Sequence, residues 1–129
     1  MKLQPDRIPG QTVTGHGAGW IGLDGEKFQQ SLLIAWTGLR LVWDVSLNDL
    51  PSSAHMPALL EIQPEILLIG CGEKKVLIPH QHLAKLMSQN VGIELMDTAA
   101  ACRTYNILAG ENRKVAAILL LQTDPQQKS

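Results

Sequence analysis

The sequence lacks the features that mark several large classes of protein. Its two cysteines, Cys71 and Cys102, are too few for a disulfide framework and do not have metal-ligand spacing, so reduced thiols in a cytosol are the expected state. The longest apolar run, residues 115–121, is far shorter than the roughly 20 residues of a membrane-spanning helix. The first ten residues hold no apolar segment of signal-peptide length. We therefore expect a cytoplasmic protein that does not span a membrane.

Excess charge and catalytic motifs are also missing. The formal net charge is -1, and the cations are scattered, with adjacent pairs only at Lys74-Lys75 and Arg113-Lys114. Because no basic field is present, nucleic-acid binding is not expected. The chain has no P-loop lysine and no nucleophile-elbow serine. His80 and His82 are two residues apart, which places them on different faces of a helix. We therefore predict no catalytic residue, no metal and no cofactor.

What is present predicts a single globular domain over residues 1–129. The hydrophobic fraction of 45% and the charged fraction of 18% are typical of a soluble protein of this size. Residues 7–46 read as a β-rich half, in which Asp24-Gly25 and Thr37-Gly38 mark hairpin turns. A loop and a short helix follow, with Pro57 in the first turn of the helix. Residues 123–129 read as a flexible polar tail.

The second half, residues 64–122, alternates strands and helices. The apolar run at 65–70 and the segments at 93–97 and 114–122 predict three strands. Leu83, Leu86 and Met87 fall at helical spacing and predict a helix that begins at Pro79 and ends near Asn90. Residues 98–108 predict a second helix. Both gaps between strands are long enough for helical crossovers between parallel strands. The pattern therefore predicts an α/β fold with a βαβαβ second half.

Several ordered pieces resemble one known family. They are "PEILLIGCG" at 64–72, "GIELMDTAAACRTYNIL" at 92–108, "RKVAAILL" at 113–120, the glycine-rich opening, "DGEKFQQSLLI" and Trp43. This combination resembles a small family of largely unknown biochemical function. The family includes the mitochondrial respiratory complex I assembly factor 3 and small archaeal and bacterial single-domain proteins. The chain departs from the family at Cys71, where a threonine is usual, and at His16, where an aromatic residue is usual.

The resemblance covers nearly the whole chain and implies both an architecture and a role. The implied architecture has three layers: an N-terminal antiparallel β layer, a mixed sheet on which it packs, and helices. The implied role is that of an assembly or interaction factor. No activity, cofactor or catalytic residue of the family is established that transfers to this chain.

Residues that follow the first two predicted parallel strands form the candidate ligand-binding site. The ends of parallel strands meet at one edge of a sheet, and ligands of open α/β sheets bind there. Gly70-Cys71-Gly72 has no third glycine, and a lone G-x-G is only weak evidence for a phosphate-binding loop. The favoured interpretation is a tight turn at the end of the strand. Asp97 or Thr98 is also suited to cap the following helix, with Cys102 and Tyr105 facing the sheet. The candidate residues are Gly70, Cys71, Gly72, Asp97, Thr98 and Arg103.

The first functional hypothesis is a non-enzymatic interaction or assembly-factor module that binds a protein partner. Its candidate surface is the glycine-rich N-terminal sheet. Whether Trp20, Trp36 and Trp43 are exposed decides whether this surface can bind a partner, because aromatic residues carry much of the binding energy at interfaces. A homo-oligomer formed through a sheet edge is also compatible with the sequence.

Two alternatives remain open. The first is a small-molecule binding protein or enzyme that uses the carboxyl edge around Cys71, Asp97 and Arg103, which requires a concave pocket. The second is a thiol switch between Cys71 and Cys102, which requires Cα atoms within roughly 7 Å.

Overall fold

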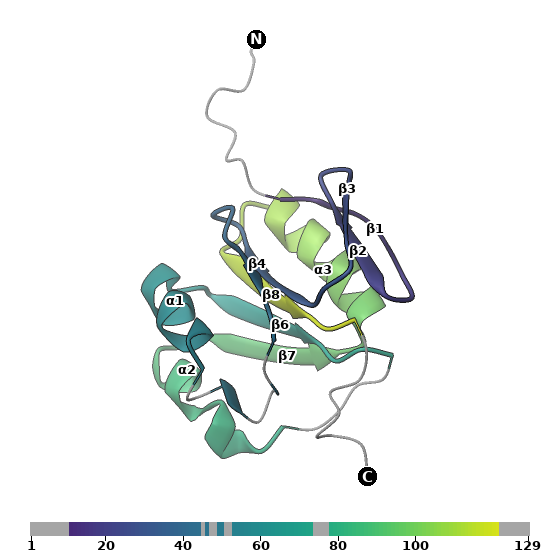
Figure 1. Cartoon of the computed structure of the whole chain (residues 1–129). Helices are drawn as coiled ribbons and strands as arrows, with labels where there is room; N and C mark the ends of the chain where they lie inside the picture. Colours follow the sequence, from purple (N-terminus) through teal and green to yellow (C-terminus); the bar gives the residue numbers. More distant parts are fainter. Residues whose placement is uncertain (1–10, 45, 47–48, 51–52, 74–77, 122–129) are drawn as a thin grey trace.

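The computed structural model of the chain describes residues 11–44, 46, 49–50, 53–73 and 78–121 (Figure 1). The predicted tail and the first residues of the predicted β-rich half lie outside this part. Three strands form an antiparallel sheet in the order β1-β2-β3, and five form a mixed sheet in the order β5-β4-β8-β6-β7. The elements are β1 (Val13–Gly17), β2 (Trp20–Leu23), β3 (Glu26–Phe28), β4 (Leu32–Ala35), β5 (Arg40–Val42), α1 (His55–Ile62), β6 (Ile66–Gly70), the 3₁₀ helix η2 (His80–His82), α2 (Ala84–Ser88), β7 (Gly92–Met96), α3 (Thr98–Gly110) and β8 (Val115–Leu119).

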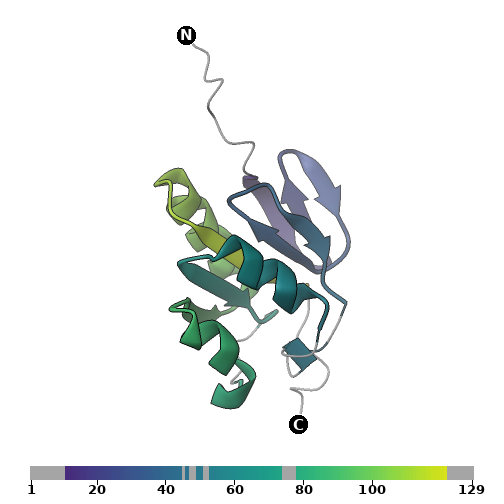
Figure 2. The same ribbon diagram turned by 90° about the vertical axis from the view of Figure 1, so that its left-hand side faces the viewer.

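The elements form three layers around the five-stranded sheet (Figures 1 and 2). Helices α1 and α2 cover one face, and α3 covers the other face together with the three-stranded sheet. Strand β4 shows the alternation that supports both layers: Leu33 faces the α1–α2 side, whereas Leu32 and Ile34 face α3 and the small sheet. The predicted α/β class is confirmed, including the antiparallel layer on a mixed sheet and the βαβαβ second half.

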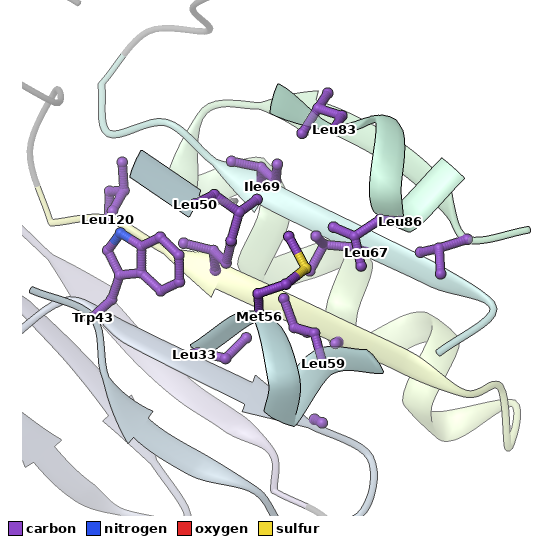
Figure 3. Packing of buried hydrophobic residues seen from close by; sticks show 14 of the residues in the cluster. Leu33, Trp43, Leu50, Met56, Leu59, Leu67, Ile69, Leu83, Leu86 and Leu120 are labelled. Atoms are coloured by element: carbon purple, nitrogen blue, oxygen red, sulfur yellow. The ribbon is translucent and has the colours of Figure 1, made fainter. Parts of the chain in front are cut away.

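The central strands β6 and β8 are apolar on both faces because both faces are covered. Every residue of β8 is buried, and β6 pairs with β8 in parallel without a register shift. On the α1–α2 side, Leu67 and Ile69 of β6 pack in one cluster with Met56 and Leu59 of α1 and Leu86 of α2 (Figure 3). The continuous apolar runs of the second half are therefore those of buried parallel strands.

Both predicted hairpin turns are present. Asp24 and Gly25 join β2 to β3 with φ of 51° and 88°, the positive values that a type I′ turn requires at both central positions. Gly38 lies between β4 and β5 with φ of 95°. These turns set the register of β2 with β3 and of β4 with β5.

One predicted element is wrong in its extent. The sequence predicted one helix from Pro79 to about Asn90, and the structure divides it into η2 and the five-residue α2. The amides of His82 and Leu83 donate to carbonyl oxygens three residues earlier, which is the 3₁₀ pattern, and no side chain caps the start of α2. Asn90 has φ of 65° and ends the segment, as predicted.

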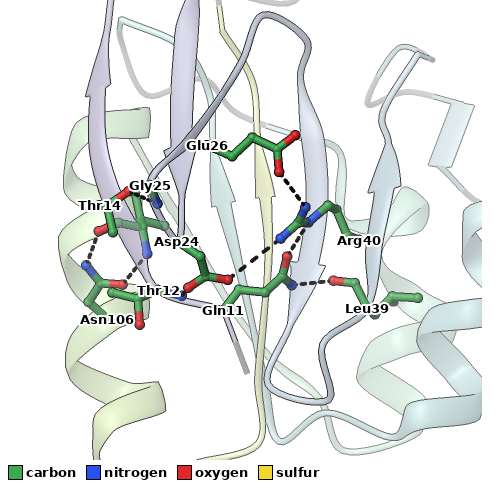
Figure 4. Close-up of polar contacts among 10 residues, drawn as sticks. Gln11, Thr12, Thr14, Asp24, Gly25, Glu26, Leu39, Arg40 and Asn106 are labelled. Atoms are coloured by element: carbon green, nitrogen blue, oxygen red, sulfur yellow. Dashed lines mark hydrogen bonds and ion pairs between the residues drawn. The ribbon is translucent and has the colours of Figure 1, made fainter. Parts of the chain in front are cut away.

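The side chain of Asn106 attaches the three-stranded sheet to α3 (Figure 4). The Val13 amide donates to Asn106 Oδ1 at 2.9 Å, and Asn106 Nδ2 donates to the Val13 carbonyl at 2.8 Å. Thr12, one residue earlier, bonds in the opposite direction, to Asp24. The amide of Asn106 thus takes the place of a neighbouring strand along β1.

Arg40 connects the small sheet to β5 (Figure 4). Its Nε donates to Gln11 Oε1 at 2.6 Å, and its guanidinium lies 3.7 Å from Asp24 and 3.9 Å from Glu26. Buried Gln11 in turn donates to the Leu39 carbonyl at 2.6 Å. Exposed ion pairs contribute about 0–1 kcal/mol each, so this network mainly sets the position of the two sheets.

Replacing Asn106 with alanine should destabilise the fold by about 1–3 kcal/mol, because the amide and carbonyl of Val13 lose their partners. Urea unfolding followed by circular dichroism measures the change. Ile107→Ala on the same helix is the control, since Ile107 is 60% exposed and its truncation should cost less than about 0.5 kcal/mol. Equal losses in the two variants would show that Asn106 does not hold β1.

Candidate functional site

The carboxyl edge of the parallel strands brings five of the six predicted site residues together. The Cys71 amide donates to the Met96 carbonyl at 2.8 Å, and the Thr98 amide donates to the Gly72 carbonyl at 2.8 Å. The segment that leaves β6 therefore runs directly beside the segment that leaves β7 and starts α3. Arg103 lies further along α3 and is exposed.

The Thr98 hydroxyl joins three segments at this edge. It accepts a hydrogen bond from the Gly72 amide at 2.8 Å and donates one to the Leu120 carbonyl at 2.5 Å. The Leu120 amide donates to the Gly70 carbonyl at 3.1 Å. The donor and acceptor of this hydroxyl are both used to connect the ends of β6 and β8 to the start of α3.

The glycines of the G-x-G segment are explained by packing and backbone conformation. A Cβ atom on Gly70 would lie 2.9 Å from Thr98 Cα and 3.0 Å from Ala101 Cβ, so α3 can approach β6 only if residue 70 is glycine. Gly72 has φ of 92°, a conformation that side chains rarely adopt. Both features are those of a tight turn at the end of a strand.

Asp97 is the N-cap of α3, one of the two residues, with Thr98, that the sequence predicted for this position. Its Oδ1 accepts a hydrogen bond from the Ala100 amide at 2.7 Å, and its backbone is extended with φ of -69° and ψ of 162°. This bond satisfies one of the amides that a helix start leaves without a partner.

Cys102 and Tyr105 face inward from α3, which confirms their predicted packing role. Burial raises the pKa of the Cys102 thiol to about 11, although the nearby charge of Arg103 acts in the opposite direction. Burial also raises the pKa of Tyr105 to about 12, and the negative charge of Asp24 adds to the effect. At neutral pH both groups are protonated, so neither is an activated nucleophile.

The two thiols lie on opposite faces of the five-stranded sheet. Cys71 is 0% exposed and belongs to the cluster on the α1–α2 side, whereas Cys102 is 1% exposed and belongs to the cluster on the α3 side. The Cys71 thiol also donates to the Ile69 carbonyl at 3.6 Å. A disulfide between them would need the sheet to open, so this geometry argues against the thiol switch.

Trp43 and His55 form a buried pair that sequence reasoning missed. Their ring centroids are 4.5 Å apart, and His55 Nε2 lies 2.8 Å from the Val42 carbonyl. Trp43 Nε1 and His55 Nδ1 are buried without a hydrogen-bond partner among the described residues. No local signal in the sequence connects residues from a strand end and a helix start.

Trp20 and Trp36, in contrast, are only half-buried. The Trp20 ring lies across β1, where a Cβ on Gly15 would come within 3.0 Å of it and one on Gly17 within 2.4 Å. Lys27 Nζ lies 4.6 Å from the centroid of the ring. Gly15 and Gly17 therefore leave room for the Trp20 ring to pack directly on the backbone of β1, on the outer face of the small sheet.

The described residues lack two features that mark other classes of protein. No helix in this part of the chain combines the length and apolar character needed to cross a membrane. No three His, Cys, Asp or Glu side chains in the same part lie together as metal ligands would.

The fold and this edge define a class of small α/β domain, in which an antiparallel sheet and one helix share a face of a five-stranded mixed sheet. The chain belongs to the family described as "Protein of unknown function (DUF498/DUF598)", whose model matches residues 13–120. The resemblance stated from the sequence is thereby confirmed.

Three relatives illustrate the likeness. A Bordetella pertussis protein described as an Mth938-like domain has a solution structure with a TM-score of 0.76 and 32% identity, covering 96% of this chain and 94% of that one. The "13 kDa major membrane protein" of Francisella tularensis is 31% identical over 96 residues, 73% of this chain and 77% of that protein. The NADH dehydrogenase (ubiquinone) 1 alpha subcomplex assembly factor 3 of Danio rerio is 35% identical over 82 residues, 62% of this chain. The match covers 47% of that assembly factor, so the chain spans about half its length.

Replacing Thr98 with valine keeps the shape of the side chain and removes its hydroxyl. The Gly72 amide and the Leu120 carbonyl then lose a partner, and the free energy of unfolding should fall by about 1–3 kcal/mol. Thr104→Val on the same helix is the matched control, because no hydrogen bond joins the Thr104 side chain to the described residues. Similar unfolding midpoints in urea for both variants would contradict the role given to Thr98.

Stability should also fall in alkaline solution. The unfolded chain loses the protons of Cys102 and Tyr105 near their usual pKa values of 9.0 and 10.0, whereas the folded chain holds them until about 11 and 12. These groups therefore leave the free energy of unfolding unchanged below about pH 9 and lower it as pH rises towards 12. Urea unfolding at a series of pH values measures this slope. A Cys102→Ala, Tyr105→Phe double variant should show a shallower fall, and an unchanged slope would refute the assignment.

Proposed function

We propose that this protein is a non-enzymatic interaction module that assists the assembly of a protein complex by binding a protein partner. The observation that carries the proposal is the closed carboxyl edge, where the polar groups of Gly72, Asp97 and Thr98 bond to one another or to neighbouring backbone. Chemistry on a substrate needs such groups to be available. The likeness to a protein named as an assembly factor supports the same conclusion.

The outer face of the small sheet is the first contact surface in this proposal. Trp20 is half-buried, and the backbone of Gly15 and Gly17 supports one face of its ring. A rigid aromatic side chain loses little conformational entropy on binding, and tryptophan is among the residues that most often dominate interface energies. Lys27 beside the ring adds a positive charge at the same place.

A small-molecule or enzymatic role around Cys71, Asp97 and Arg103 is the less well supported alternative. Cys71 is buried, and the Asp97 carboxylate caps α3. Arg103 has no hydrogen bond or ion pair with the described residues, but one exposed guanidinium is a common surface feature. The net charge of -1 gives no support to nucleic-acid binding.

A cytoplasmic location is part of the proposal. It is supported by two buried cysteines that carry free thiols. Because one relative is named as a membrane protein, fractionation of cells into soluble and membrane material is the direct test.

Affinity purification with mass spectrometry, using the full chain expressed in its native cells, tests the interaction role. Wild type should enrich a defined set of proteins, and Trp20→Ala should reduce that enrichment about tenfold or more, the effect expected of an interface hot spot. Met87→Ala is the control, since Met87 is 40% exposed on α2, across the five-stranded sheet from Trp20, and its variant should behave as wild type. Enrichment that is absent, or equal in all three proteins, would count against the proposal. Circular dichroism checks that each variant is folded.

A further inference from the structure

The two sheets have four outer strand edges in the described part of the chain, at β1, β3, β5 and β7. An unprotected edge presents a row of amides and carbonyls that can pair with another strand. Proteins therefore cover or interrupt the strand edges that must not pair with another strand. The four edges differ in how far they are protected in this way.

The edge of β1 is covered at Val13 and irregular beyond it. Asn106 bonds to both the amide and the carbonyl of Val13, and the pairing with β2 shifts register between Val13 and Gly15. A side chain thus occupies the position of an added strand, and the irregularity that follows prevents regular pairing.

The edges of β3 and β5 are short and charged. Each strand has three residues. Strand β3 exposes Glu26 and Lys27, and Arg40 of β5 is held by Gln11, Asp24 and Glu26. Short strands and charged side chains are common means of blocking an edge.

Strand β7 has five residues and a single charged side chain, Glu94, and no side chain in the described part of the chain is hydrogen-bonded to its backbone. It pairs with β6 in parallel without a register shift. The Gly92 amide donates to Glu65, and the Met96 carbonyl accepts from Cys71, so Gly92, Glu94 and Met96 bond towards β6. Because parallel strands alternate, Ile93 and Leu95 direct their amides and carbonyls away from β6. The outer edge offers two donors and two acceptors.

The side chains of β7 define what can bind there. Ile93 and Leu95 are half-buried and pack against the cluster on the α1–α2 side, so they present an apolar strip next to the open edge. Glu94 lies on the opposite face, is exposed, and makes no ion pair with the described residues. A single negative charge therefore marks the centre of the edge.

We propose that the β7 edge binds an extended segment of a partner protein as a sixth strand, with a lysine or arginine of that segment beside Glu94. Backbone hydrogen bonds to Ile93 and Leu95 supply the binding, and the charge of Glu94 selects the segment. This inference rests on the proposed interaction function and names its surface. A second copy is disfavoured, because pairing Ile93 of one copy with Leu95 of another brings two Glu94 carboxylates directly opposite each other.

Two blocked peptides test the proposal on the full chain. Both alternate threonine and valine over seven residues, with lysine at the centre of one and glutamate at the centre of the other. Amide NMR spectra are recorded at peptide concentrations up to the millimolar range. We expect the lysine peptide to shift the amides of Ile93 and Leu95 and to bind at least about threefold more tightly than the glutamate peptide. Glu94→Lys should reverse the preference, whereas Glu61→Lys, an equal charge change on α1, should keep it.

The proposal is overturned if neither peptide shifts β7, or if Glu94→Lys leaves the preference unchanged. A wild-type dimer in sedimentation with slowed exchange of the Ile93 amide would overturn it too, because the edge would then belong to a second copy. Any of these three results can occur while the Trp20-dependent capture of partners persists. In that case the interaction function stands and only its assignment to β7 fails.

Discussion

The contact between the start of α3 and the end of β6 is the constraint on which the rest of the structure depends. Gly70 allows the helix backbone to approach, and the Thr98 hydroxyl then bonds to the segments that follow β6 and β8. Because a helix is rigid, this contact at its first turn also fixes its later turns. Cys102 and Tyr105 are thereby directed into the core, and Asn106 is directed to the edge of β1. One helix thus sets the position of both sheets.

The same constraint decides which parts of the molecule remain available for function. At the carboxyl edge, where ligands of open α/β sheets usually bind, the Thr98 hydroxyl and the Asp97 carboxylate are hydrogen-bonded within the fold. The outward amide and carbonyl of Val13 in β1 are used by Asn106. In the described part of the chain, the Trp20 ring packed over Gly15 and Gly17 and the outer edge of β7 stay available. Both are suited to contact with a protein chain, because one offers a rigid apolar surface and the other offers backbone groups.

Features with a local chemical cause could be predicted from the sequence, and those that join distant residues could not. Asp24-Gly25 predicted its turn because few residue pairs accept positive φ at both positions. The pair Asp97-Thr98 predicted the start of α3 because capping depends on neighbours three residues away. Asn106 and Val13 are 93 positions apart and meet only in the folded chain. The split between η2 and α2 was missed because helical spacing shows which residues face the core, not whether the helix is continuous.

Binding through backbone groups would also explain why the sequence carries no recognisable site motif. Motifs arise where chemistry demands particular side chains at fixed spacing, as in metal or phosphate sites. An added strand is held by amides and carbonyls that every residue possesses, and side chains contribute only selectivity. Along β7 that selectivity comes from the exposed carboxylate of Glu94 and from the half-buried Ile93 and Leu95. Each is an ordinary residue of an edge strand when seen in the sequence, and only the strand order gives it a role.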